Sequence, residues 1–394
     1  MRFDFDTPAV RRGTDSAKWD IGENELPMWV ADMDFKTAPC VELAVMERAA
    51  HGIFGYNTFP TAAWQRAYTD WWRIRHGFDM KKEWLAFVMG VIPAVSSSIR
   101  ALSEKGDKVV ILTPNYSSFF HLIEGNGRVS AEVPMLLSRD ENGLRYDIDW
   151  DALEAALSDP ASKLMIFCNP QNPTGKIWER ETMARIGEMC RKYGVIVLSD
   201  EIHSDIAAPG HKVTPFAAVN ETNLALTATY LAPTKAFNIM SLRTAAVCVA
   251  DPDLRGKITG SFGDIAGTNV FSAPAAIAAF SEEGGAWLDE LNAYIRANKD
   301  RTAEFLKAEL PELEAVGPSD ATYLMWIHTG KIAENSEDFQ KKLRADTGLY
   351  VCPGVWYRGD GEQFIRFNAA APRVLLDDAL ERLKTGVRIY KAGK

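Results

Sequence analysis

The sequence predicts an α/β fold: a large domain with a mostly parallel central sheet flanked by helices, followed by a smaller α/β domain. Two observations support this prediction. Short apolar runs alternate with helical patterns through the middle of the 394-residue chain, and repeats of strand, helix and strand favour parallel sheets with helices on both faces. In the last third of the chain, longer helical stretches replace this alternation, which indicates a second unit.

The predicted elements of the large domain follow one another in a regular order. Residues 109–112 form an apolar run that ends in turn residues, and residues 163–168 form another that ends in Asn-Pro turn chemistry. Apolar residues between Met183 and Tyr193 then recur at helical spacing, and Gly194 supplies a stop signal. Further strands are predicted at residues 195–198, 224–231 and 245–250.

The C-terminal third is predicted to start with a long helix over residues 286–309. We expect it to continue with strands at 313–316 and 323–327, a charged helix at 331–344, a strand at 364–367 and a final helix at 375–390. The predicted large domain therefore covers residues 46–285, and the small C-terminal domain covers residues 286–394.

Composition and charge argue against several classes of function. The net charge is −9 and no dense Lys/Arg run is present, so we expect no nucleic-acid partner. The five cysteines are scattered and odd in number, which favours reduced core residues of a cytoplasmic protein over a disulfide frame or a metal site. We expect no signal peptide, because residues 1–6 have no apolar core, and no membrane span, because the longest uncharged stretch, 265–281, is short and interrupted.

Three polar residues follow predicted strands: Asn172, Asp200 and Lys235. A lysine after a buried strand is costly unless it has a function or reaches water. Taken singly, Asn172 also fits plain turn chemistry before Pro173, and Asp200 fits a turn or a helix cap. Ligands of open parallel sheets bind beyond the carboxyl ends of the strands, so we expect the three side chains to converge there.

An amide, a carboxylate and an amine in this order match the needs of pyridoxal phosphate. This cofactor requires a lysine that binds it covalently and an acid that keeps its pyridine nitrogen protonated. It also requires a donor to its ring oxygen and a cradle for its phosphate. Lys235, Asp200 and Asn172 fit the first three needs, since a carboxylate beside the pyridinium favours the charged form. We therefore predict an enzyme that uses pyridoxal 5'-phosphate.

Three further residues suit the same cofactor. Gly90 precedes a helical pattern that runs to about residue 104, and free N–H groups at a helix start bind anions with help from the helix dipole. Arg243 offers a bidentate phosphate partner, and a surface arginine between strands is the ordinary alternative. Tyr116 follows a strand and a turn, where its ring either stacks on the pyridine or packs in the core.

Three motifs carry a family resemblance: Asn-Pro-Gln-Asn-Pro-Thr-Gly at 169–175, Ser-Asp-Glu-Ile-His-Ser-Asp at 199–205 and Thr-Lys-Ala-Phe-Asn-Ile at 234–239. They resemble the fold-type I, class I/II aminotransferase superfamily. One branch of this superfamily is the closer match: the cystathionine β-lyase (carbon–sulfur lyase) enzymes of the PatB/MalY type. The resemblance to this branch lies in residues 29–35, in Gly-Tyr-Asn at 55–57 and in the second motif. The resemblance covers essentially the whole chain. It implies a fold-type I enzyme in which residues 1–45 pack with the small domain.

The resemblance implies a role for each matching residue around the ring of the cofactor. Lys235 holds the cofactor and later moves the proton, and Asp200 pairs with the pyridinium nitrogen. Asn172 pairs with the ring oxygen and lies at the substrate, while Tyr116 stacks on the ring. His203, in the second motif, we expect to be a structural residue.

Other matching residues are implied to bind the phosphate, the substrate or the neighbouring subunit. Arg366 matches the arginine that grips the substrate α-carboxylate, a role that suits a buried bidentate cation; a structural ion pair is the alternative. Val30 is implied at the substrate, and Tyr56 matches a tyrosine that reaches the neighbour's cofactor across a homodimer interface. The remaining implied cofactor contacts are Gly90, Val91, Ile92, Thr234 and Arg243.

Three positions depart from the family pattern. Ala232 stands where the family usually has a serine, so one hydroxyl of the phosphate cradle is missing, and we expect Arg243 to compensate. Met240 and Ser241 replace a more usual Ala-Gly. These departures concern the geometry around the phosphate and not the use of the cofactor.

Three functions are compatible with these residues. The first is a β-lyase of amino-acid metabolism and methionine biosynthesis, in which Lys235 takes the Cα proton of cystathionine or a similar cysteine S-conjugate. Expulsion of the thiol then yields pyruvate and ammonia. The second is an aminotransferase that uses the same residues, and the third is a regulatory protein that binds a partner beside its lyase activity. The sequence leaves the choice of leaving group open, as it does the choice between elimination and transamination.

Overall fold

The computed structural model describes residues 2–263, 267 and 269–393. The uncharged stretch 265–281 therefore lies partly outside the described residues. Within the described part, no helix has the length and apolar character needed to cross a membrane. The same part contains no group of three or more His, Cys, Asp or Glu side chains arranged to hold a metal ion. All five cysteines are free.

The central sheet confirms the predicted mostly parallel architecture. Its neighbouring strands run parallel except at β10, which is antiparallel to both of its partners, β9 and β2. β2 therefore points the same way as β8 and β9, and the carboxyl ends of these strands lie at one edge. The strand order is β2 (Leu85–Val88), β10 (Ala245–Val249), β9 (Thr227–Leu231), β8 (Ile196–Asp200), β7 (Ser162–Cys168), β3 (Lys108–Thr113) and β4 (Val129–Pro134).

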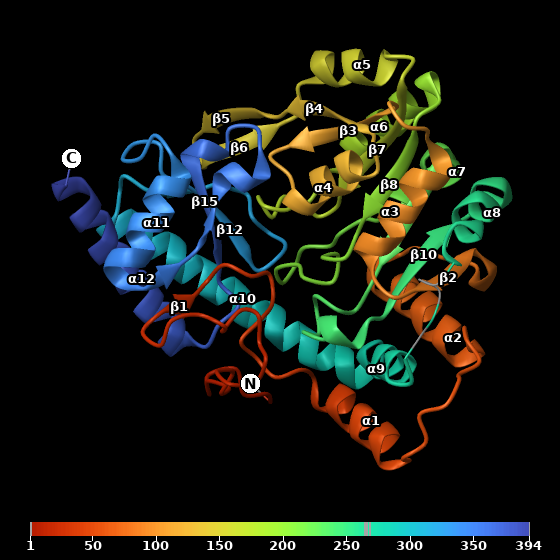
Figure 1. The fold of residues 1–394 in the computed structure, drawn as a ribbon, viewed down its shortest axis with the longest axis horizontal. Coiled ribbons are helices and arrows are strands. Elements are labelled where there is room, and N and C mark those ends of the chain that lie inside the picture. The colour runs from red at the N-terminus through yellow and green to blue at the C-terminus, as the bar shows by residue number, and fades with distance from the viewer. Residues whose placement is uncertain (1, 264–266, 268, 394) are drawn as a thin grey trace.

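Helices cover both faces of this sheet (Figure 1). In β3, Val109 and Ile111 pack on one side and Val110 and Leu112 on the other, as the two-residue period of a strand requires. Burial on both faces explains why this strand appears in the sequence as an unbroken apolar run. The first face is covered by α3 (Val91–Leu102), α4 (Ser117–Gly125) and α8 (Pro252–Gly260), and the second by α5 (Trp150–Ser158) and α6 (Arg180–Tyr193).

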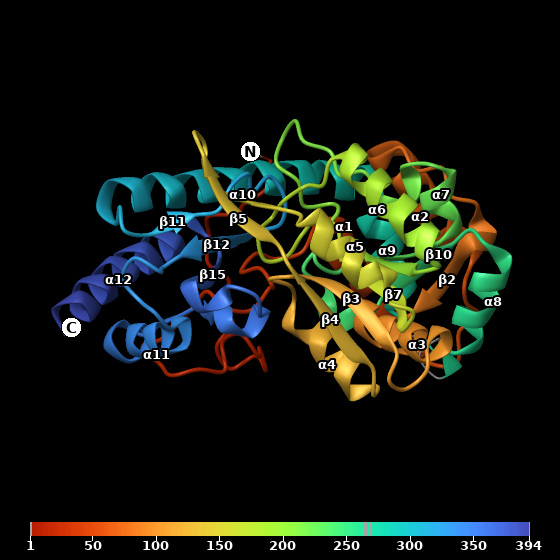
Figure 2. The same ribbon diagram turned by 90° about the horizontal axis from the view of Figure 1, so that it is seen from above.

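The C-terminal third forms a separate antiparallel sheet. Helix α10 (Glu282–Glu309) runs from this part toward the central sheet, as Figure 2 shows. Near the N-terminus, β1 (Leu26–Pro27) pairs in parallel with β13 (Leu349–Tyr350), and Leu26 packs into the core of the C-terminal part. The strand order is β11 (Glu314–Ala315), β12 (Leu324–His328), β15 (Phe364–Asn368) and β14 (Cys352–Pro353), flanked by α11 (Ser336–Thr347) and α12 (Arg373–Ala392).

The remaining elements connect these two parts or lie at their edges. Helix α9 packs against α1, α2 and α10. The hairpin of β5 and β6 follows β4 directly in the chain. These elements are α1 (Pro39–Ala50), α2 (Ala62–Trp71), β5 (Leu136–Asp140), β6 (Gly143–Asp147), α7 (Glu221–Ala225) and α9 (Ser272–Ala279).

Two element predictions were wrong at their N-terminal ends. The run 224–231 is not all strand, because Leu224 belongs to α7 and β9 begins only at Thr227. The side chain of Asn220 accepts a hydrogen bond from Asn223 N and caps that short helix. Likewise α11 starts at Ser336 rather than near residue 331, since Asn335 caps it with bonds to the next turn.

We propose the same division into an N-terminal segment, a large part and a small C-terminal part. It is supported by the distinct sheets and by the pairing of β1 with β13. Residue 45 lies within α1 and residue 285 within α10, so these helices join the parts. In Figure 2 the long helix α10 extends from the C-terminal part to the large part.

Candidate active site

The predicted anchors lie at the carboxyl edge of the central sheet. Asp200 is the last residue of β8, Asn172 lies in the turn after β7, and Lys235 lies in the turn after β9. The charges of Asp200 and Lys235 influence each other's pKa, and Arg366 influences that of Lys235. Arg366 in turn donates a hydrogen bond to Asn172 Oδ1 at 3.4 Å. The fold therefore brings these four side chains together.

The amine of Lys235 has the character of a reactive lysine. Burial and, to a smaller extent, the nearby Arg366 cation together lower its pKa to about 8, while Asp32 and Asp200 oppose the shift. Its Nζ atom donates a hydrogen bond to the carbonyl oxygen of Ala31 at 2.5 Å. A lysine with this pKa presents a sizeable neutral fraction near neutral pH, which a nucleophile or a base needs.

Asp200 is a buried carboxyl group with unused acceptor capacity. Burial raises its pKa to about 6, and the N–H of Ile202 and the charge of Lys235 act in the opposite direction. The Ile202 N–H binds Oδ1 at 3.1 Å. A carboxylate that is buried in this way gains from a cationic partner, such as a protonated ring nitrogen.

Arg366 is a buried cation, with 3% of its surface exposed. Its guanidinium donates to Trp29 O at 2.8 Å and to Asn172 Oδ1 at 3.4 Å, and it lies over the ring of Tyr357. Among the described residues, no carboxylate forms an ion pair with Arg366, and its buried Nε atom has no hydrogen-bond partner. Since buried charges are normally paired, the arrangement fits an anionic ligand better than a structural ion pair.

The start of α3 provides the anion-binding end of the site. The helix begins at Val91, and its first N–H groups lack intrahelical acceptors, as in every α-helix. Within the described residues no side chain caps them, so they are available to an anion. Ala232 and Val91 share one hydrophobic cluster, against which Ile92 packs. Gly90 occupies the N-cap position, and Thr234 is buried beside Lys235.

Tyr116 lies directly before α4 and is half-buried. The backbone N–H of Tyr116 donates to Asn115 Oδ1 at 2.8 Å, and Gln171 Nε2 donates to Pro114 O at 2.7 Å. The second bond joins the loop of Tyr116 to the loop of Asn172. The electrostatic influence of Tyr116 on the pKa of Arg366 places it in the same group.

Two predicted residues do not reach this group within the single chain. The side chain of Arg243 is exposed and makes no hydrogen bond or ion pair to any described residue, and its backbone is left-handed at φ 52°. Tyr56 is fully exposed, within the exposed run 51–58. Val30 is half-buried, and its carbonyl accepts a bond from Asn368 at 2.7 Å. The roles of Arg243 and Tyr56 thus remain predictions. They require contact with the cofactor or with a neighbouring subunit.

The residues present fit pyridoxal 5'-phosphate. The buried carboxylate of Asp200 suits the ring nitrogen, and the amine of Lys235 suits the covalent link. The buried amide of Asn172 suits the ring oxygen. The uncapped start of α3 suits the phosphate group.

Comparison with known proteins gives the relationship directly. Residues 23–383 match the family model described as aminotransferase class I and II. The chain belongs to the aminotransferase class I and II family. Cystathionine beta-lyase PatB of Bacillus subtilis is 40% identical over 97% of this chain and 99% of its own. Protein MalY of Escherichia coli is 33% identical over 99% of this chain and 100% of its own.

Solved structures match the fold closely. Cystalysin from Treponema denticola, which contains a pyridoxal 5'-phosphate cofactor, has a TM-score of 0.92 and 29% identity, covering 99% of this chain and 100% of its own. The PLP-bound C-S lyase from Staphylococcus hominis has a TM-score of 0.89 and 30% identity, covering 98% and 99%. The predicted family and fold class are thereby confirmed.

Sequence reasoning missed Tyr323 and did not place His203 close to the site. The hydroxyl of Tyr323 donates to Ala31 O at 2.8 Å, beside the amine of Lys235, and no sequence signal marks it. Burial, followed by the charges of Lys235 and Arg366, holds the pKa of His203 well below its usual value, and its ring packs against Tyr323. His203 is therefore a neutral imidazole close to the site, where the sequence indicated only packing.

Proposed function

We propose that the protein is a pyridoxal 5'-phosphate-dependent carbon–sulfur β-lyase. Its substrate is cystathionine or another cysteine S-conjugate, and its products are a thiol, pyruvate and ammonia. The observation that carries the proposal is the buried Arg366, which lacks a carboxylate partner among the described residues and lies with Asn172 beside the amine of Lys235. This arrangement suits an α-amino acid. The relative named cystathionine beta-lyase PatB supports elimination at a carbon–sulfur bond.

The side chains have distinct tasks in this reaction. When bound, the cofactor supplies an electron sink for the electron pair released at Cα. Arg366 holds the substrate α-carboxylate, and Asn172 orients it from the neighbouring turn. Lys235 Nζ would take the Cα proton of the substrate. Asp200 keeps the ring nitrogen protonated, and the thiolate leaves from Cβ with the electron pair.

The test is pyruvate release from cystathionine. The holoenzyme should form pyruvate and a free thiol in equal amounts, and Lys235→Ala should lose this activity, because it removes both the covalent link and the base. A matched variant, Lys163→Ala at an exposed lysine, should retain it. A holoenzyme that forms no pyruvate from cystathionine, cysteine or other S-conjugates would overturn the proposal.

An aminotransferase is the second candidate, because the matching family model carries that description. It would use Lys235 to move the same proton back onto the cofactor rather than to permit loss of a thiolate. Conversion of the cofactor to its pyridoxamine form on addition of an amino acid, with release of a keto acid, is the distinguishing result. Dominant pyruvate formation without that conversion supports the lyase.

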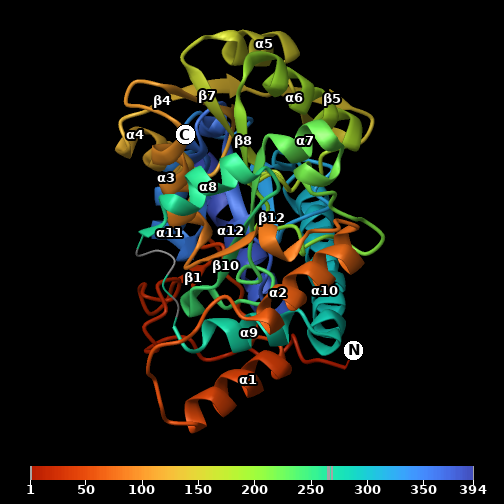
Figure 3. The same ribbon diagram turned by 90° about the vertical axis from the view of Figure 1, so that its right-hand side faces the viewer.

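We infer further that the active unit is a homodimer with Tyr56 at the subunit interface. Large apolar side chains are exposed on α1 and on the segment after it, and contiguous exposed patches of this kind mark interaction sites. Figure 3 shows α1 at the edge of the molecule. Light scattering should give twice the mass of the chain, and a monomer with full activity would contradict the inference. The exposed side chains are Leu43, Met46, Ile53, Phe54 and Tyr56.

We also propose a cytoplasmic enzyme of methionine biosynthesis. The five free cysteines, four of them buried, support a reducing compartment. Cleavage of cystathionine would supply the thiol that methionine synthesis consumes. Expression of the chain should restore growth without methionine to a strain that lacks its own cystathionine β-lyase, and Lys235→Ala should not.

A further inference from the structure

Residues 29–35, which we call the strap, accept hydrogen bonds from both Lys235 and Arg366. Lys235 Nζ donates to Ala31 O at 2.5 Å, and Arg366 Nη2 donates to Trp29 O at 2.8 Å. The two acceptors are only two residues apart in the chain. The backbone of the strap therefore determines how the amine and the guanidinium lie relative to each other.

Two asparagines strengthen this connection, and each follows one of the two site residues closely in sequence. Asn238, three residues after Lys235, accepts from Met33 N at 3.1 Å and donates to Met33 O at 2.8 Å and to Phe35 O. Asn368, two residues after Arg366, donates to Val30 O and Asp32 O, both at 2.7 Å. The chain segments that carry Lys235 and Arg366 are thus both hydrogen-bonded to the strap.

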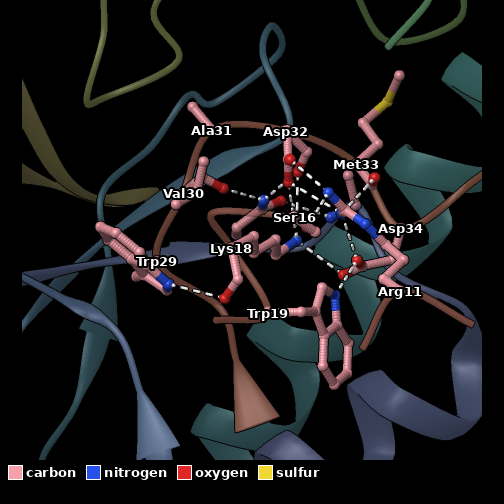
Figure 4. Close-up of polar contacts among 12 residues, drawn as sticks. Arg11, Ser16, Lys18, Trp19, Trp29, Val30, Ala31, Asp32, Met33 and Asp34 are labelled. Atoms are coloured by element: carbon pink, nitrogen blue, oxygen red, sulfur yellow. Dashed lines mark hydrogen bonds and ion pairs between the residues drawn. The ribbon is translucent and has the colours of Figure 1, made fainter. Parts of the chain in front are cut away.

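Arg11 and Lys18 bind the strap through an ion cluster with Asp32 and Asp34, which belong to the strap itself (Figure 4). Asp34 is 2% exposed and Lys18 is 1% exposed, and Lys18 Nζ lies 2.7 Å from Asp34 Oδ2. Arg11 donates to Asp34 Oδ1 and to Asp32 Oδ2, each at 2.7 Å. The two cations and the two carboxylates balance in charge.

The indole of Trp19 completes the contacts of Asp34. Its Nε1 atom donates to Asp34 Oδ1 at 2.8 Å. Lys18 also donates to the backbone carbonyl of Asp32 at 3.3 Å, so it binds the main chain of the strap as well as its side chains. A buried ion pair can often be replaced by neutral residues without loss of stability, so stability alone does not explain the presence of one here.

We propose that Lys18 and Asp34 are positioning residues for the reaction. The ion pair between Lys18 and Asp34 anchors the strap so that Ala31 O faces the amine of Lys235 and Trp29 O faces Arg366. Neither residue touches the substrate. They act through the backbone of the strap. They help Arg366 bind the substrate carboxylate, and they keep the amine of Lys235 in place. This inference rests on the proposed lyase function.

The experiment uses the holoenzyme and a charge-balanced double variant, Lys18→Met with Asp34→Asn. The pair Arg11–Asp32 remains in this variant, so no charge is left buried without a partner. We expect full cofactor content and a melting temperature within a few degrees of the original. The KM for cystathionine and the inhibition constant of propionate should rise at least tenfold, and amides 29–35 should exchange hydrogen faster.

Two further variants separate positioning from general effects. Glu25→Gln breaks the half-exposed ion pair with Arg344, which ties the same N-terminal segment outside the strap. It should leave KM and the exchange of amides 29–35 unchanged. Asp34→Asn alone leaves the cluster unbalanced, and its loss of stability should be reversed in the double variant while the rise in KM is not.

The proposal is overturned if the double variant shows the original KM, propionate inhibition and exchange at the strap. It is also overturned if the double variant recovers KM together with stability, because the cluster would then only neutralise charge. Propionate binding and hydrogen exchange do not depend on turnover. An enzyme that releases no pyruvate therefore defeats the lyase function, while these two measurements still decide the role of Lys18 and Asp34.

Discussion

The Nζ atom of Lys235 lies 2.5 Å from the carbonyl oxygen of Ala31, a residue 204 positions earlier in the chain. This contact joins the turn after β9 to the N-terminal segment at the centre of the site. It gives the amine a fixed acceptor while burial depresses its pKa. The chemistry of Lys235 therefore depends on a segment that is far from it in the sequence.

The first prediction concerns the pKa of Lys235 in the cofactor-free protein. Because burial lowers it, labelling of this amine should rise with a midpoint near pH 8, whereas exposed lysines follow their ordinary value of about 10.4. Asp200→Asn removes a charge that raises this pKa, so the midpoint should fall further. Peptide mass spectrometry after a short pulse of amine reagent gives the profile, and a midpoint near 10 would contradict the prediction.

The second prediction concerns Arg366→Lys. Lysine keeps the charge but loses the planar fork that binds a carboxylate with two bonds, so kcat/KM should fall about 100-fold, mainly through KM. Steady-state kinetics with cystathionine measures this. Arg344→Lys, at a partly exposed pair with Glu25, is the matched control and should change kcat/KM less than about twofold. Equal effects of the two substitutions would refute a role in substrate binding.

The third prediction concerns Gly175, in the loop that carries Asn172. Its φ is 75°, and an added Cβ would lie 2.6 Å from Ala321 O and would also meet Ser319 Oγ. Lys299 donates to Ser319 O at 2.6 Å and to Ala321 O at 3.0 Å, so neither residue can move away easily. Gly175→Ala should therefore destabilise the protein by more than about 2 kcal/mol and reduce activity.

Gly194 provides the control for Gly175. It has a similar φ of 70°, but nothing lies within 4 Å of an added Cβ. Gly194→Ala should cost only the conformational strain, about 1 kcal/mol, and leave kcat/KM unchanged. Urea unfolding of both variants separates the two effects, and equal losses would show that the close approach at Gly175 is unimportant.

The fourth prediction concerns the pH dependence of stability through Glu201. Burial raises its pKa to about 7, while bonds from Phe216 N and Ser199 Oγ oppose the shift. Because this folded value exceeds the ordinary 4.5, the stabilisation is complete below pH 4.5 and is lost as the pH rises through about 7. From pH 5 to pH 8, the original protein should lose about 2–3 kcal/mol relative to Glu201→Gln.

Denaturant unfolding at the two pH values tests this prediction. Glutamine keeps an oxygen for the Ser199 and Phe216 bonds and does not titrate. Glu188→Gln, at an exposed pair with Arg191, should change in parallel with the original protein. If Glu201→Gln also changes in parallel, Glu201 is not the group responsible.

Five of the seven strands of the central sheet, all but β2 and β4, and three site residues could be predicted from the sequence. Strands buried on both faces appear as apolar runs, and a polar residue directly after such a run is a local signal. Asn172, Asp200 and Lys235 carried that signal and lie at the carboxyl edge of the sheet. Gly194 marked the end of α6, where its φ is 70°. The start of β9 was mispredicted, because the short capped helix α7 shares the apolar character of the strand.

How these residues are used depends on contacts between distant parts of the chain. The bond of Arg366 to Trp29 O joins residues 337 positions apart, and the absence of a carboxylate partner among its described neighbours cannot appear in a sequence. The burial of Lys18 against Asp34 is equally invisible, since charged residues near an N-terminus ordinarily face water. Local propensity and hydrophobic pattern encode strands and turns, whereas burial and the pairing of distant charges arise only when the whole chain packs.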